Sequence, residues 1–169
     1  SEGWDLLIRA SKALEDSSLI SRKLASSYSV TLASPAYLKK HGTPKKPQDL
    51  ADHDTISYSN LKQPKLWRYV LANGKTVEVN IKSRLITNSP EMELAMCMAG
   101  QGITRLPAFN LHDELETGAL VQLFPDLPRS EIGVYLVYPS RKHMASKVRH
   151  FIDFMVAELG DPESKTASG

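Results

Sequence analysis

The chain has 169 residues, of which 41% are hydrophobic, and its 21 basic and 19 acidic residues give a net charge of +2. This composition is typical of a folded globular protein, and it excludes a polycation built to bind phosphate backbones along its whole length. A single cysteine, Cys97, excludes an internal disulfide framework, and five scattered histidines without paired spacing argue against a zinc site.

Strands and short helices alternate along the sequence, which predicts an α/β protein. Strands are predicted from apolar or alternating runs, and helices from caps and from apolar residues at steps of three and four. In chain order the predicted elements are a strand at 5–10, two β-rich runs within 19–34 around Ser26 and Ser27, helices at 35–41 and 46–54, a strand at 55–59, a hairpin or strand pair within 66–88, a helix at 90–100, a strand at 103–109, a helix at 110–118, and strands at 120–124 and 132–139, followed by a helix at 144–159. Leu50 is the expected buried contact of the helix at 46–54, and Phe151 is among the apolar residues expected on the buried face of the last helix.

Two local signals in this series are especially clear. Asn73-Gly74 lies between two alternating runs, and this dipeptide is the strongest short signal for a β-hairpin. Ser89 and Pro90 open the helix that ends at Gly100, as an N-cap and a first helical residue do. Gly102 follows that helix, and we expect it to adopt a backbone conformation that is closed to other residues.

Several predicted strands lead directly into a helix start or a proline, at Ser34-Pro35, at Asn88-Ser89-Pro90 and at Leu106-Pro107. In α/β sheets, ligands bind beyond the carboxyl ends of the strands, where helix N-termini offer free N–H groups and partial positive charge. The sequence therefore predicts a cleft that binds a small, anionic molecule.

A set of segments in a fixed order resembles one family, the effector-binding domain of LysR-type transcriptional regulators. The segments cover nearly the whole chain: "DLLIR" (5–9), "DSSLISRKL" (16–24), "LASPAYLKKHGTPKKPQDLADHD" (32–54), "AGQGITRLPAF" (99–109), "GALVQLF" (118–124) and "VYPSRKHMASKVRHFIDF" (137–154). Any one of these segments is a weak signal, whereas the ordered set is specific.

The resemblance implies two α/β subdomains with the type 2 fold of periplasmic binding proteins and an effector cleft between them. Residues 1–30 and 132–160 would form part of subdomain I, residues 31–131 would form subdomain II, and residues 161–169 would be a disordered tail. Members of the family begin with a winged helix-turn-helix that reads DNA, and the resemblance implies that this segment and half of subdomain I are absent from the sequence. DNA binding is therefore expected of the whole regulator, as a homodimer or homotetramer, and not of this chain alone.

The resemblance also points to candidate effector ligands. Arg9 matches a position that faces the cleft, where a guanidinium can pair with a carboxylate, although a salt bridge at a strand end is the alternative. The others lie at the ends of two predicted β segments, where ordinary capping of a turn or a helix is the alternative. These candidates are Ser57, Ser59, Asn60, Thr87 and Asn88.

The sequence favours effector sensing over a thiol sensor, a solute-binding protein and an enzyme. Cys97 lies among methionines and leucine with no cationic neighbour within four positions, so a buried small hydrophobe is favoured over a thiol sensor. A solute-binding protein of the same architecture is the alternative function. An enzyme is disfavoured, since no nucleophile elbow, zinc-protease motif or phosphate loop is present. We expect no cofactor and no metal. The absence of a signal peptide or an apolar run of membrane-spanning length favours the cytoplasm.

Overall fold

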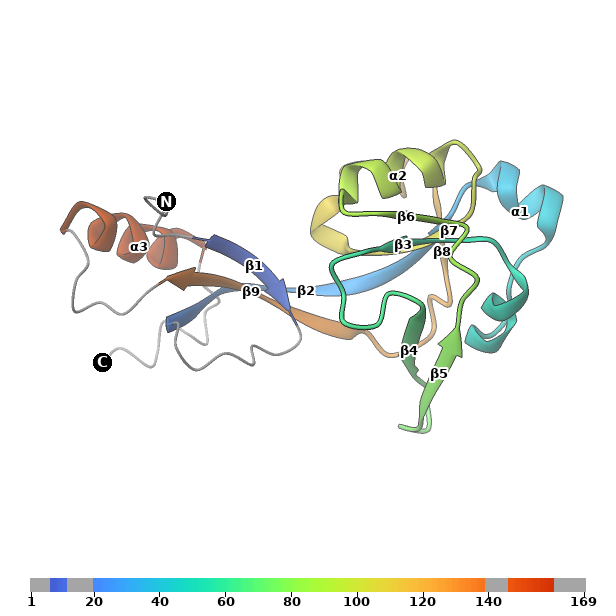
Figure 1. Cartoon of the computed structure of the whole chain (residues 1–169), viewed down its shortest axis with the longest axis horizontal. Coiled ribbons are helices and arrows are strands. Elements are labelled where there is room, and N and C mark those ends of the chain that lie inside the picture. Colours follow the sequence, from blue (N-terminus) through green and yellow to red (C-terminus); the bar gives the residue numbers. More distant parts are fainter. Residues whose placement is uncertain (1–6, 12–19, 139–145, 160–169) are drawn as a thin grey trace. The chain divides into compact units, whose positions relative to one another are not determined.

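The structure, a computed structural model, describes residues 7–11, 20–138 and 146–159, and within residues 7–11 and at Leu159 it describes the backbone alone. The chain divides into two compact units, which we call unit 1 (residues 1–27 and 131–169) and unit 2 (residues 28–130). Figure 1 shows the elements of each unit.

Unit 1 is a small sheet covered by one helix. Strand β9 pairs with β1 in antiparallel fashion and with β2 on its other side. Leu24, Leu136, Tyr138 and Ile152 form the buried core of the unit, and they come from β2, β9 and the helix α3. The elements are β1 (Leu7–Ser11), the first part of β2 (Ile20–Ala33), β9 (Ser130–Tyr138) and α3 (Ser146–Leu159).

Unit 2 contains most of the described chain. Its strands and helices follow the predicted order closely, and the hairpin forms around Gly74, whose φ of 82° requires glycine-like freedom. The elements are the second part of β2, α1 (Pro35–His41), the 3₁₀ helix η1 (Pro47–Asp52), β3 (Thr55–Tyr58), β4 (Leu66–Val70), β5 (Thr76–Asn80), β6 (Leu85–Thr87), α2 (Pro90–Met98), β7 (Ile103–Pro107), η2 (Ala108–Asn110) and β8 (Val121–Leu123).

The main sheet of unit 2 has the order β2–β7–β3–β6, and β8 also pairs with β2. Strands β3, β6 and β7 are parallel to one another, whereas β2 runs antiparallel to β7 and β8. Crossover connections join the parallel strands, and α2 is the connection between β6 and β7. The carboxyl ends of β3, β6 and β7 therefore lie at one edge of the sheet.

Each face of this sheet carries its own core. On one face Leu32, Ile56 and Leu106 pack with Cys97 of α2. On the other face Ala33 and Ile103 pack with Trp67 and Tyr69 of β4 and with side chains of β5, α1 and η1. We call these the helix face and the hairpin face, because α2 covers one and the β4–β5 hairpin covers the other (Figure 1). Strands covered on both faces bury consecutive residues, which explains why Thr55, Ile56 and Ser57 are all buried.

A serine side chain caps both predicted helix starts, as predicted for Ser89. The Ser34 hydroxyl accepts a hydrogen bond from the Tyr37 N–H at 3.1 Å, and the Ser89 hydroxyl accepts one from the Met92 N–H at 3.2 Å. Gly42 ends α1 with a φ of 84°, as expected of a helix C-cap glycine. The Ser-Pro pairs therefore fix where these two helices begin.

Two element predictions were wrong. β2 is one continuous strand through Ser26 and Ser27, because hydrogen bonds to β9, β7 and β8 hold its backbone extended on either side of these small residues. Residues 111–119 form turns after η2 instead of a helix. Glu114 is buried within these turns, and its carboxylate accepts the His112 N–H at 2.6 Å, a side-chain bond that satisfies a backbone donor of the turn.

Two residue-level expectations also differ from the structure. Phe151 was expected on the buried face of the last helix, but its side chain is 48% exposed, while Ile152 is the residue buried in the core. Gly102 does not have a positive φ, so the expected backbone reason is wrong. Its requirement is steric, since a Cβ at this position would lie 2.9 Å from the Asp54 carbonyl oxygen. Among the described residues, no helix is long and apolar enough to cross a membrane.

Candidate functional site

Polar side chains gather where β3 and β6 end. The N–H of Ser59, just after β3, donates to the carbonyl of Thr87 at the end of β6, at 2.9 Å. This bond brings the two chain segments side by side at the carboxyl edge of the parallel strands. We call Ser59, Asn60, Thr87, Asn88 and Ser89 the carboxyl-edge cluster. Four of the six predicted effector ligands belong to it.

The side chains of the cluster keep much of their hydrogen-bonding capacity. Ser59, Asn60 and Asn88 are exposed. The Asn60 amide donates to the Tyr58 hydroxyl at 3.3 Å, and the Ser59 hydroxyl donates to the Asn60 Oδ1 at a long 3.5 Å. Long bonds between exposed groups are easily exchanged for bonds to a ligand. The cluster therefore offers hydroxyl and amide donors and acceptors.

The start of α2 offers fewer free backbone N–H donors to a ligand than the sequence suggested. Pro90 has no N–H, the Met92 N–H is bonded to the Ser89 hydroxyl, and the Glu93 N–H donates to the Ser89 carbonyl at 3.0 Å. The Thr87 hydroxyl also accepts the Ser89 N–H at 3.2 Å. Most donors in this first turn are thus used by the helix cap, so side chains dominate the chemistry of the cluster.

The sequence suggested that the strand-to-helix junctions all meet at this edge, but the structure places one of them elsewhere. Because β2 runs antiparallel to β7, its carboxyl end and the Ser34-Pro35 junction lie at the opposite edge of the sheet. The position of Gly100 agrees with this, since an added Cβ there would lie 3.5 Å from the Ser34 hydroxyl, at the far end of α2. The prediction that α1 helps to form the ligand cleft is therefore wrong.

The remaining two candidates are not part of the cluster. Ser57 is buried within β3, and its hydroxyl shares a 2.7 Å hydrogen bond with the hydroxyl of Ser83. Ser83 has a φ of 44°, and its N–H donates to the Thr55 hydroxyl at 2.9 Å, so these bonds stabilise a strained turn before β6. Arg9 lies in β1 of unit 1 opposite Tyr135, and its side chain lies outside the described part of the structure.

A buried acid lies on the same helix that the cluster leads into. Glu93 of α2 is 1% exposed, and neither of its carboxyl oxygens has a hydrogen-bond partner in the described structure. Burial raises the pKa of Glu93 from 4.5 to about 8. Thr104 lies close enough to oppose this rise, but its hydroxyl proton is donated to the Ile56 carbonyl at 3.2 Å. In sequence Glu93 is an ordinary acid of the first helical turn, because one turn does not show which side of the helix faces the sheet.

Cys97 is enclosed on the helix face. It is fully buried, and its thiol donates to the Leu32 carbonyl at 3.4 Å. Burial raises the pKa of the Cys97 thiol to about 12, and the thiolate is the reactive form. The site therefore keeps the thiol protonated and out of reach of solvent.

We expect Cys97 to resist a water-soluble disulfide reagent such as dithionitrobenzoate in the folded chain, and to react with one equivalent once denaturant unfolds it. Cys97 is the only cysteine, so the colour released reports this site alone. The labelling rate should follow the unfolding rate as denaturant is added. Stoichiometric labelling within seconds under native conditions would contradict the buried, protonated thiol.

Among residues 20–138 and 146–158, whose side chains the structure describes, no group of three or more histidine, cysteine, aspartate or glutamate side chains is arranged to hold a metal ion. The chemistry of the carboxyl-edge cluster is likewise that of neutral hydrogen bonding. Such a cluster suits the recognition of a small polar molecule.

Comparison with known proteins gives a consistent result. The family model described as "LysR substrate binding domain" matches residues 1–160. An uncharacterised HTH-type transcriptional regulator of Haemophilus influenzae is 37% identical over 148 residues, which are 88% of this chain and 51% of that protein. The HTH-type transcriptional regulator CrgA of Neisseria meningitidis is 31% identical over 158 residues, 93% of this chain and 52% of CrgA. The chain thus spans about half the length of these relatives.

Solved structures agree with the sequence matches. The full-length Vibrio cholerae virulence activator AphB, a member of the LTTR protein family, superposes with a TM-score of 0.77 at 31% identity, over 92% of this chain and 52% of AphB. The regulatory domain of CrgA superposes with a TM-score of 0.76 at 31% identity, over 92% of this chain and 76% of that domain. The predicted mixed α/β fold is confirmed by these matches.

Proposed function

Because the chain belongs to the LysR substrate-binding domain family, we propose that it senses a small-molecule effector for a DNA-binding transcriptional regulator of the LysR type. Effector binding would shift the equilibrium between two states of the regulator. This shift would change how the regulator binds DNA and the transcription of its target genes. The relatives are transcriptional regulators, and a periplasmic-type solute-binding protein is not favoured.

We propose that the carboxyl-edge cluster contributes the effector contacts of unit 2. The observation that carries this proposal is the Ser59–Thr87 backbone bond, which gathers exposed hydroxyl and amide groups at the carboxyl ends of parallel strands. This is the edge at which α/β sheets bind ligands. Asn60 and Ser59 are the leading candidates, Thr87 and Asn88 follow, and Ser57 contributes by holding the turn at Ser83. Arg9 in unit 1 remains a predicted partner for an anionic group.

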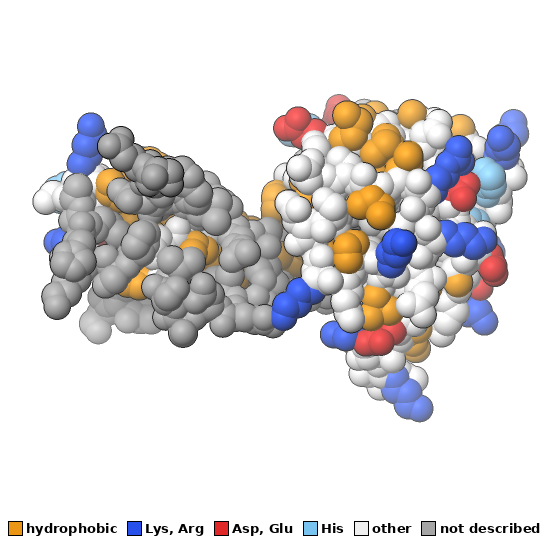
Figure 2. Space-filling view, viewed as in Figure 1, with side chains coloured by type: hydrophobic (Ala, Val, Ile, Leu, Met, Phe, Trp, Pro, Cys, Tyr) orange, Lys and Arg blue, Asp and Glu red, His pale blue; other side chains and the backbone are white. Residues whose placement is uncertain are grey.

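Units 1 and 2 are proposed to be the two regulatory subdomains, with residues 1–30 and 132–160 as part of subdomain I and residues 31–131 as subdomain II. DNA contact is assigned to a winged helix-turn-helix of the whole regulator. The regulator is proposed to act in the cytoplasm as a homodimer or homotetramer, and to catalyse no reaction. Family members are oligomeric, and we propose α2 and β6 as the candidate dimer surface. Figure 2 shows apolar side chains exposed over α2. The exposed apolar residues of these two elements are Met92 and Met98 of α2, at 51% and 45% exposure, and Ile86 of β6, at 49%.

The test of this proposal is an effector titration. With the full-length regulator and a promoter it controls, Asn60→Ala should raise the effector concentration for half response about tenfold, since a hydrogen bond to a charged ligand is worth about 1.5–3 kcal/mol. The melting temperature should change little, because Asn60 is exposed. Asn80→Ala, at an exposed amide at the end of β5, is the matched control and should leave the response unchanged. An unchanged midpoint for Asn60→Ala, Ser59→Ala and Thr87→Val together would remove the cluster from the effector site.

A further inference from the structure

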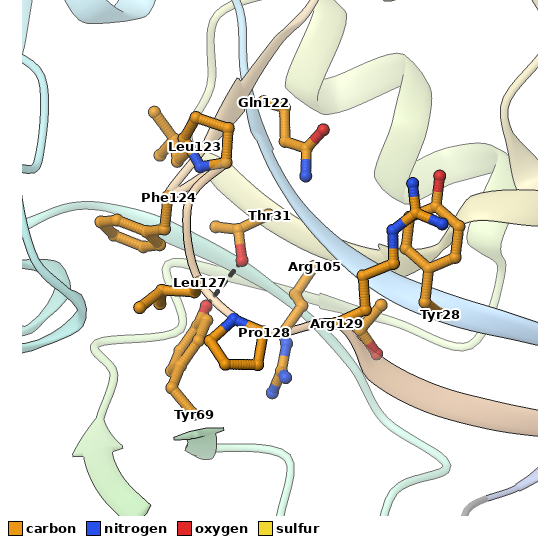
Figure 3. Close-up of a pocket in the computed structure, with 12 residues that line it drawn as sticks. Tyr28, Thr31, Tyr69, Arg105, Gln122, Leu123, Phe124, Leu127, Pro128 and Arg129 are labelled. Carbon is orange, nitrogen blue, oxygen red and sulfur yellow. Dashed lines mark hydrogen bonds between the residues drawn. The ribbon is translucent and has the colours of Figure 1, made fainter. Parts of the chain in front are cut away.

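A second feature of unit 2 is a cavity of about 120 Å³ on the hairpin face of its sheet (Figure 3). It lies between β2, β7, the hairpin strand β4 and the loop that follows β8. The lining includes two arginines, Arg105 and Arg129, and it includes no aspartate or glutamate. The walls of the cavity therefore carry positive charge that no acidic residue among them neutralises.

Arg105 is the inner of these two cations. Its guanidinium carbon lies 4.4 Å from the centroid of the Tyr69 ring, and its Nε is buried without a hydrogen-bond partner among the described residues. No ion pair joins it to an acid in the described parts of the chain. Arg105 is thus held by a ring face alone, although a guanidinium has five N–H donors.

The surroundings of Arg105 are built to hold it in place. The Tyr69 hydroxyl shares a 2.7 Å hydrogen bond with the Thr31 hydroxyl, and Thr31 lies directly opposite Arg105 in the β2–β7 pair. Arg129 lies elsewhere in the lining, with its guanidinium carbon 3.9 Å from the centroid of the Tyr28 ring (Figure 3). Both guanidinium groups are therefore oriented by aromatic rings, which leaves their hydrogen-bond donors available to a ligand.

The loop after β8 forms an apolar wall of the cavity and is strained. Phe124 has a φ of 53°, a region that an aromatic L-residue rarely adopts, and its ring packs edge-on against Tyr69 with centroids 5.7 Å apart. Leu123, Leu127 and Pro128 complete this wall. Strain of this kind persists where surrounding structure enforces it, and it is common at ligand sites.

We propose that this cavity is a second small-molecule site, which binds a small aliphatic carboxylate with its carboxylate on Arg105 and its apolar end against the Phe124 loop. A planar guanidinium fork matches the two oxygens of a carboxylate. Because an apolar cavity of about 150 Å³ can bind benzene, a cavity of about 120 Å³ fits a ligand with only a few non-hydrogen atoms. Most of the lining is polar, but its one apolar wall, of leucine, phenylalanine and proline, gives an alkyl chain contacts that inorganic phosphate cannot make.

The burial of Arg105 also supports an anion as the ligand. It lowers the pKa of Arg105, because a dehydrated cation is costly, and Tyr69 offsets only part of that effect. An anion beside the guanidinium would replace part of the lost hydration. The site is also separate from the carboxyl-edge cluster, since it lies on the hairpin face and shares no residue with that cluster.

The test is an NMR titration of the ¹⁵N-labelled chain with butyrate, butyramide and inorganic phosphate at constant ionic strength. The buried Nε–H of Arg105 exchanges slowly and gives its own signal, which Arg105→Gln identifies by removing it. We expect butyrate to shift this signal and the amides of Thr31 and Gln122 saturably, whereas uncharged butyramide should not. Phosphate should bind at least several-fold more weakly than butyrate. Saturation by butyramide, tighter binding of phosphate, or no saturable shift would each overturn the proposal.

Variants at Arg105 then test whether butyrate binds in this cavity. Arg105→Gln should weaken butyrate binding, followed at Thr31, about tenfold or more. Arg105→Lys, which keeps the charge and loses the fork, provides the same comparison should the glutamine variant not fold. Arg68→Gln is the matched control, because Arg68 lies on the same strand as Tyr69 but is exposed and paired with Glu78 at 2.6 Å. Equal affinity in wild type and both Arg105 variants would place the ligand elsewhere.

Asn60→Ala separates this site from the proposed effector site. Butyrate affinity at Arg105 should be unchanged by this substitution. If Asn60→Ala abolished butyrate binding while the Arg105 variants did not, the cavity proposal would fail and the proposed function would stand. Loss of effector response in Asn60→Ala with intact butyrate binding would support both.

Discussion

Replacing Glu93 by glutamine should make the protein more stable at pH 8, and it should remove much of the dependence of stability on pH. The pKa of Glu93 is about 8 in the folded chain against 4.5 for an ordinary glutamate, so its carboxyl group is neutral in the folded protein at pH 7. Below pH 4.5 the group is protonated in both states and its contribution is fully present. As the pH rises, the unfolded chain loses this proton first, so the free energy of unfolding falls by about 1.4 kcal/mol per pH unit until the folded group ionises near pH 8.

Glutamine has nearly the same shape as glutamate and does not ionise, so the variant lacks this fall in the free energy of unfolding with rising pH. We expect Glu93→Gln to exceed the wild type in free energy of unfolding by about 2–4 kcal/mol at pH 8, and the two curves to converge towards pH 4.5. Urea unfolding followed by circular dichroism across this range measures the difference. Glu91→Gln is the matched control, because Glu91 is an exposed acid in the same turn of α2. Parallel curves for wild type and Glu93→Gln would show that the buried carboxyl does not control the pH dependence.

Placing a valine at Gly102 should lower the free energy of unfolding by about 1–3 kcal/mol. An added Cβ would lie 2.9 Å from the Asp54 carbonyl oxygen and 3.2 Å from its carbon, which is closer than side chains and backbone tolerate. The Asp54 carbonyl cannot easily move away, because it accepts the Ile103 N–H at 2.9 Å and so joins the start of β7 to the start of β3. The two strands would have to separate where their parallel pairing begins.

Denaturant unfolding of Gly102→Val and Gly102→Ala should give midpoints in the order wild type, alanine, valine. Gly74→Asn in the hairpin turn is the control, since no heavy atom lies within 4 Å of an added Cβ there and asparagine tolerates positive φ. Its stability should stay within about 0.5 kcal/mol of wild type. Equal midpoints and slopes for wild type and Gly102→Val would mean that the close approach to Asp54 relaxes without cost.

The separation of the functional residues along the chain explains how much of the site could be predicted from the sequence. Ser59, Asn60, Thr87 and Asn88 were selected because the family resemblance points to the ends of two predicted β segments, and parallel pairing of β3 and β6 brings the two pairs together. The cavity around Arg105 had no such signal. Its walls come from β2, β4, β7 and the loop after β8, and only the folded sheet places Arg105 beside Tyr69, 36 residues away in the chain.

Local chemistry was sufficient for those parts of the fold that depend on neighbouring residues. Short-range sterics and hydrogen bonding set the features that were predicted correctly: the helix start at Ser34-Pro35, the Ser89 cap, the Asn73-Gly74 turn and the buried Leu50 in η1. The order of strands and helices follows from the same rules. The ordered motifs also predicted the LysR-type family, which the comparisons confirm.

Tertiary structure decided the features that depend on direction and burial. The antiparallel course of β2 against β7 sends Ser34 to the opposite edge from Asn88, and sheet pairing keeps β2 unbroken through Ser26 and Ser27. Glu93 and Arg105 are ordinary charged residues in sequence, and they become an ionisable core residue and a cation in a cavity because partners distant in the chain remove their water. Short-range propensities fix which elements form, but the energy of a charged group depends on everything that packs around it, and that arrangement exists only in the folded chain.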